Sequence, residues 1–102
     1  MYRRVKMEGS VIRKFPLTMR TLRTADIHEN RVGFVVRKKA GSAVFRNAIR
    51  RVLREKFRQT MANFVQPAWV VFEVSDRAAE STRSDLHMHA QFLLSSLCQA
   101  QP

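Results

Sequence analysis

The chain contains a single cysteine, Cys98, among its 102 residues. One thiol cannot form an internal disulfide, so the sequence argues against a disulfide-stapled secreted domain and favours a reducing compartment, for which we expect the cytoplasm. No apolar run is long enough for a membrane-spanning helix, and the basic N-terminus is not followed by the apolar segment of a secretory signal. Low-complexity linkers and internal repeats are also lacking, so we expect one domain over residues 1–102.

Acidic residues are scarce: eight Asp and Glu stand against nineteen Lys and Arg, for a formal net charge of +11. The excess is local, because residues 31–58 hold ten Lys or Arg and one acid, whereas residues 59–102 hold two and four. Such a concentration of positive charge repels itself unless an anion lies against it. The pattern therefore favours a polyanionic partner, nucleic acid first and an anionic membrane surface second, over a basic face that is merely solvated.

The few acids form no catalytic cluster. A protein nuclease gathers carboxylates around metal ions or pairs a histidine with an acid, and no two acids of this chain make a tight motif. His87 and His89 are two apart on an expected helix, so they point about 200° apart and cannot share a metal there. The sequence thus predicts neither catalytic nor metal-binding protein residues, which argues against a nuclease acting alone.

Three segments have the pattern of β-strands. Residues 10–23 alternate loosely between apolar and polar side chains and predict one half-buried strand, in which Pro16 marks an edge position or a bulge. Residues 31–37 are a β-branched and aromatic run, and residues 68–74 are a continuous apolar run; each predicts a further strand. The three strands, together with helices, indicate an α+β fold.

Two helices are expected after the second and third strands. The first runs over about residues 43–63 with Ser42 as its N-cap, and the second over about residues 85–97. Because a long helix joins the strands 31–37 and 68–74, these two strands should run parallel.

Projection of residues 43–63 on a helix separates an apolar face from an arginine face. The apolar arc contains Phe45, Ala48, Ile49, Val52 and Leu53, with Phe57 at its border. The opposite arc contains Arg46, Asn47, Arg50, Arg51, Arg54 and Arg58. Like charges four residues apart destabilise an isolated helix, but a phosphate backbone would turn that repulsion into attraction. A membrane-surface helix would need exposed bulky apolar residues, and here those residues are needed to cover the sheet.

The segment RVGFVVRKKAGSAVFRNAIRRVLREKFR, residues 31–58, resembles the central block of the bacterial ribonuclease P protein component. That family's pattern is a strand ending in two lysines, a Gly-x-Ala-Val turn, and a helix opening Arg-Asn-Arg-x-(Lys/Arg)-Arg. The matching positions are Lys38, Lys39, Gly41, Ala43, Val44, Arg46, Asn47, Arg50 and Arg51. The flanking segments agree in the order of their elements, so the resemblance extends over nearly the whole chain.

The resemblance implies a single-domain α/β sandwich with a mostly antiparallel central sheet, a left-handed βαβ crossover and a long Arg-rich helix. It further implies that the N-terminal helix is truncated here, since nine residues precede the first expected strand. Two features depart from the family pattern. Ala48 stands where the motif has its second Arg, and we expect it in the core. The third strand ends in Glu73 and Val74, where the family tends to carry basic residues.

The implied function is that of the protein subunit of ribonuclease P, a ribonucleoprotein endoribonuclease that removes the 5′ leader from precursor tRNA. The RNA subunit is the catalyst, and Mg²⁺ is held mainly by that RNA. The implied catalytic-RNA contacts are Arg37, Lys38, Lys39, Arg46, Asn47, Arg50, Arg51, Arg54 and Arg58. The implied leader-binding cleft contains Tyr2, Phe15 and Leu17, whose side chains would stack on or pack against unpaired bases. The alternative is a ribosomal-type RNA-binding protein with no role in cleavage.

Overall fold

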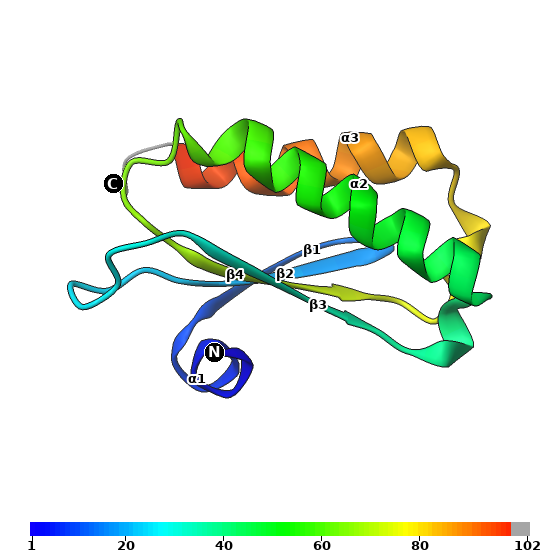
Figure 1. The fold of residues 1–102 in the computed structure, drawn as a ribbon, viewed down its shortest axis with the longest axis horizontal. Coiled ribbons are helices and arrows are strands. Elements are labelled where there is room, and N and C mark those ends of the chain that lie inside the picture. Colours follow the sequence, from blue (N-terminus) through cyan, green and yellow to red (C-terminus); the bar gives the residue numbers. More distant parts are fainter. Residues whose placement is uncertain (99–102) are drawn as a thin grey trace.

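A computed structural model describes residues 1–98 and shows a four-stranded sheet with helices on both faces (Figure 1). The strand order is β1-β2-β4-β3, with bounds β1 Ser10–Lys14, β2 Leu17–Leu22, β3 Arg31–Val36 and β4 Trp69–Val74. One face is covered by α2 (Ala43–Met61) and α3 (Arg83–Ser95), and the short helix α1 (Tyr2–Glu8) lies against the other. The α+β sandwich with a mostly antiparallel sheet is therefore confirmed.

The prediction of one strand over residues 10–23 is wrong, because this segment is a β-hairpin. β1 pairs antiparallel with β2 from Ser10↔Thr21 to Lys14↔Leu17, and Phe15 and Pro16 form the turn between them. Pro16 has no N–H to donate to a ladder, so it is better placed in a turn than within a strand. The alternation reflects mainly β2, in which Leu17 and Met19 are buried and Thr18 and Arg20 are half-buried, whereas β1 is mostly exposed.

The crossover from β3 to β4 is as predicted. The two strands run parallel, with a register from Arg31↔Trp69 to Val36↔Val74, and α2 connects them. Ser42 is the N-cap of α2, because its hydroxyl accepts a hydrogen bond from the Phe45 N–H at 3.1 Å. The helix ends at Met61, two residues before the predicted end. The hand of the crossover stays a prediction.

The main core lies between the sheet and the helices α2 and α3. From α2 it receives Ile49, Val52, Leu53 and Phe57, and from α3 it receives Leu86, Ala90, Leu93 and Leu94. Phe57, expected at the border of the apolar arc, is buried and meets the Phe64 ring edge-on at 5.7 Å. Ala48 is half-buried beside this core rather than inside it. The helix α3 starts at Arg83, two residues before the predicted start, because Thr82 and Asp85 form a capping box.

The helix α1 is seven residues long and buries one side chain, Val5, in a small cluster with Leu22, Ile27 and Val71. The turn from α1 into β1 requires Gly9, since a Cβ there would lie 2.5 Å from two backbone oxygens.

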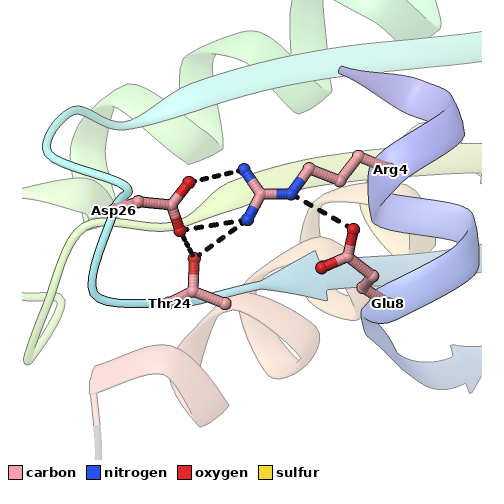
Figure 2. Close-up of polar contacts among 4 residues, drawn as sticks. All are labelled: Arg4, Glu8, Thr24 and Asp26. Atoms are coloured by element: carbon pink, nitrogen blue, oxygen red, sulfur yellow. Dashed lines mark hydrogen bonds and ion pairs between the residues drawn. The ribbon is translucent and has the colours of Figure 1, made fainter.

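Polar contacts supply the rest of the attachment of α1 (Figure 2). The Arg4 guanidinium donates to both oxygens of Asp26, at 2.7 and 3.0 Å, and to Glu8 at 3.3 Å, while the Thr24 hydroxyl also donates to Asp26. The same guanidinium lies 5.5 Å from the centre of the Trp69 ring. The loop between β2 and β3 thereby fixes the position of α1 on the sheet.

Candidate nucleic-acid interface

The loop before α2 is shaped by Gly41. The short 3₁₀ turn Lys38–Ala40 follows β3, and Gly41 after it has a φ of 152°. A Cβ at this position would lie 2.5 Å from the ring of Phe45. Only glycine combines that backbone conformation with such a close approach. The turn leads directly into α2, so Lys38 and Lys39 precede its first turn by only a few residues.

Hydrogen bonds and stacking orient three arginines of α2. Arg46 donates from Nε to the Gly41 carbonyl at 3.2 Å, and Arg50 donates to the Asn47 side-chain oxygen at 3.0 Å. The Arg54 guanidinium lies 5.3 Å from the centre of the Phe34 ring on β3. Arg51 and Arg58 are exposed on the same helix. A guanidinium held in this way keeps several N–H groups for a phosphate and loses less entropy on binding it.

Ion pairs separate five arginines of residues 1–98 from the others. Arg4, Arg20, Arg31, Arg37 and Arg77 each form an ion pair with an acid. Within that part of the chain, no acid forms an ion pair with the seven residues that we call the basic surface: Lys38, Lys39, Arg46, Arg50, Arg51, Arg54 and Arg58. Arg37, also predicted as an RNA contact, is instead bonded to Asp76 at 2.5 Å. The charge of the basic surface is thus open to an external anion.

A groove of about 450 Å³ lies at the β1–β2 turn, on the face of the sheet that carries α1. Its lining comprises Arg13, Phe15, Pro16, Leu17, Thr18, Val35, Arg37, Glu73, Val74 and Ser75. The strand registers place Arg13, Thr18, Glu73 and Val35 in one row across the four strands. Cross-strand partners share a face of a sheet, so this row forms the floor of the groove.

The three predicted cleft residues have different positions. Phe15 lines the groove and is 51% exposed, and Tyr2 reaches the floor by donating its hydroxyl to Glu73 at 2.8 Å. Leu17 borders the groove as well, but its side chain is 1% exposed and packs in the core on the opposite face, between the sheet and the helices. Leu17 therefore offers almost no side-chain surface to an unpaired base.

The groove also contains residues that the sequence did not single out as binding residues. Arg13 and Thr18 face each other across the hairpin. Arg20, which is not part of the lining, donates from Nε to the groove residue Glu73 at 2.5 Å. Burial raises the pKa of the Glu73 carboxyl, but the hydrogen bonds from Arg20 and Tyr2 outweigh burial, so this pKa lies below its ordinary value. Assigning the hairpin turn to Phe15 and Pro16 would have revealed the pairing of Arg13 with Thr18.

Residues 1–98 contain neither a metal-ligand cluster nor a membrane-spanning helix. No group of three or more His, Cys, Asp or Glu side chains in this part of the chain could hold a metal ion. None of its helices combines the length and the apolar character that crossing a bilayer requires.

Comparison with known proteins gives consistent results. The protein component of ribonuclease P from Citrifermentans bemidjiense is 57% identical over 35 residues, which are 34% of this chain and 30% of that protein. The one from Caldanaerobacter subterraneus subsp. tengcongensis is 42% identical over 52 residues, which are 51% of this chain and 45% of that protein. The aligned segments thus span less than half of these relatives.

Solved structures show the same fold. The RNase P protein of Staphylococcus aureus superposes with a TM-score of 0.82 at 21% identity, covering 96% of this chain and 91% of that one. The RNase P protein of Thermotoga maritima gives a TM-score of 0.77 at 24% identity, covering 99% and 92%. The family model described as Ribonuclease P matches residues 1–98. This match covers nearly the whole sequence and confirms the resemblance of residues 31–58: the chain belongs to the Ribonuclease P family of proteins.

Proposed function

We propose that this protein is the protein subunit of ribonuclease P, the ribonucleoprotein endoribonuclease that removes the 5′ leader from precursor tRNA. The observation that carries the proposal is the basic surface, whose seven cationic side chains have no acidic partner among residues 1–98. Family membership supports the identity of the anion, because the relatives that match are named as the protein component of this enzyme.

The basic surface binds the catalytic RNA. Arg46, Arg50 and Arg54 follow one another at four-residue spacing along α2, so their forks can meet successive phosphate oxygens along one groove edge of an RNA helix. Lys38 and Lys39 extend this contact to the loop, where the free N–H groups at the start of α2 also favour an anion. Asn47 holds Arg50 in place and retains its amide N–H groups for the RNA.

The groove near the β1–β2 turn binds the single-stranded leader of precursor tRNA. Arg13 lines it together with Phe15, and so does Arg37, whose guanidinium is paired with Asp76. The groove thus offers the cation of Arg13, which has no ion-pair partner among residues 1–98, for a phosphate next to an aromatic ring on which a base can stack. The RNA subunit performs the hydrolysis, with Mg²⁺ held mainly by that RNA, as the family resemblance implies. The protein contributes binding energy to the leader and the RNA, and it acts in the cytoplasm.

Reconstitution tests this proposal. The protein is mixed with a bacterial ribonuclease P RNA at low Mg²⁺, and leader cleavage of a precursor tRNA is measured against the RNA alone. We expect faster cleavage with the protein, and no gain with a variant in which Arg50, Arg51 and Arg54 are all changed to Gln. Circular dichroism of both proteins verifies that they are folded.

Three other results would be incompatible with the proposal. A folded protein that never accelerates cleavage would refute it. Tighter binding to ribosomal RNA than to the ribonuclease P RNA would favour the ribosomal-type alternative. Cleavage by the protein without any RNA subunit would indicate a nuclease in its own right.

A further inference from the structure

Glu73 is the one acid among the residues that line the groove. It lies on β4, an inner strand, and its side chain is 25% exposed. Arg13 and Arg37 line the same groove. A carboxylate in the floor of an RNA-binding groove repels phosphate, so the backbone of a bound strand would keep to the arginines and turn its bases toward the floor.

The orientation of this carboxylate is fixed from two sides. Arg20 donates to one oxygen at 2.5 Å, and the Tyr2 hydroxyl donates to the other at 2.8 Å. A carboxylate has about four lone-pair sites, so each Glu73 oxygen keeps acceptor capacity after these bonds. Because the pKa of Glu73 lies below its ordinary value, the group is ionised at neutral pH and can accept hydrogen bonds but not donate them.

The four bases differ in what they offer to a fixed pair of acceptors. Guanine presents a ring N–H beside an amino group, which matches both carboxylate oxygens at once. Adenine and cytosine each present one amino group. Uracil has no amino group, and its one N–H lies between two carbonyl oxygens that a carboxylate repels.

We infer that Glu73 is a specificity-determining residue that selects, for the nucleotide seated in this groove, a base with an exocyclic amino group and disfavours uracil. This inference rests on the proposed function, because it takes the occupant of the groove to be the leader of precursor tRNA. In this arrangement Arg20 and Tyr2 are positioning residues, since they act by holding the carboxylate.

The alternative explanation is that Glu73 only attaches α1 to the sheet through its hydrogen bond with Tyr2. A purely structural contact of that kind would change the cleavage rates of all leaders by the same factor, whereas a residue that contacts a base changes the rates of different leaders relative to one another. The experiment therefore measures relative rates. A precursor tRNA pool with a randomised leader is cleaved by the reconstituted enzyme at low Mg²⁺, and sequencing of the remaining substrate gives the rate for each leader.

With the wild-type protein, we expect one leader position at which guanine, and to a lesser degree cytosine and adenine, is favoured over uracil by about fivefold or more. Glu73→Ala should make the cleavage rates nearly equal for the four bases at this position. Glu73→Gln should raise the cleavage rate of leaders with uracil relative to the other bases, because the amide can donate to a uracil carbonyl while it accepts from the uracil N–H. Glu80→Gln removes the same charge at a site paired with Arg77, outside the groove lining, and should leave the ranking unchanged.

The outcomes separate the two proposals. If the wild-type protein does not accelerate cleavage of any leader, the proposed function is wrong. If it accelerates cleavage but Glu73→Ala and Glu73→Gln lower the cleavage rates of all leaders by one common factor, Glu73 only attaches α1 to the sheet and the inference is wrong. Thermal unfolding of each variant shows whether a lost preference reflects a lost fold.

Discussion

Neutralising two arginines of the basic surface tests directly whether this surface meets RNA phosphates. Seven cationic side chains there have no acidic partner among residues 1–98. If each meets one phosphate, the logarithm of the binding constant should fall with the logarithm of the salt concentration with a slope of about −5 for single strands to about −6 for duplex. Changing Arg50 and Arg54 to Gln should make this slope shallower by about 1.4 to 1.8.

The assay is a titration of the ribonuclease P RNA with protein at a series of KCl concentrations, by filter binding or fluorescence anisotropy. Arg77→Gln is the control, because Arg77 is exposed but already paired with Glu80 at 2.6 Å and lies outside the basic surface. We expect the control to leave the slope within experimental error of the wild type. A double variant whose slope equals that of the wild type would refute the assignment of these arginines to phosphate contacts, whatever its affinity at one salt concentration.

Two further predictions concern stability. Leu53→Ala should lower the free energy of unfolding by about 2–5 kcal/mol, measured by urea denaturation, because Leu53 is fully buried. The control is Val44→Ala, since Val44 is exposed. A loss below about 1 kcal/mol for Leu53→Ala would contradict the core packing. Hydrogen bonds from Arg4 and then Thr24 hold the pKa of Asp26 below its ordinary value of 3.8. A lowered folded-state pKa gives stability that is present above the ordinary pKa and is lost as the pH falls toward the lowered value. Amide exchange at Gly9, whose N–H bonds to the Val5 carbonyl, should therefore accelerate relative to core amides in strong acid. Asp26→Asn should show this faster exchange already at neutral pH. Equal protection of the Gly9 amide in both proteins at all pH values would rule out that the contact between Arg4 and Asp26 holds α1 on the sheet.

The helix α2 could be predicted from the sequence in detail because its signals are local. Ser42 caps it, and the 3.6-residue period places Ile49, Val52 and Leu53 in the core. The parallel pairing of β3 with β4 also followed, since a long helix between two strands leaves few other topologies. Phe57 is buried although the projection places it at the border of the apolar arc, and its ring meets that of Phe64, which lies beyond the helix end.

The groove could be predicted only in part, because it depends on contacts between distant segments. Period-2 alternation shows that Leu17 differs from its neighbours in the face it presents, but not which face α1 covers. Glu73 and Arg20 are 53 residues apart in the sequence, and Arg4 and Asp26 are 22 apart. No local pattern marks such pairs, so the polar contacts that build the groove and hold α1 became visible only in the folded chain.

The position of β4 has a consequence for the order in which the protein can fold during synthesis. It is the last strand to be made, yet it lies between β2 and β3 in the sheet. Until residue 74 has left the ribosome, β2 and β3 each present an open edge, and the apolar side of α2 has no complete sheet to cover. Between the synthesis of residue 58 and that of residue 74, the nascent chain thus carries its most positively charged segment without a complete sheet to pack against, next to the RNA of the ribosome.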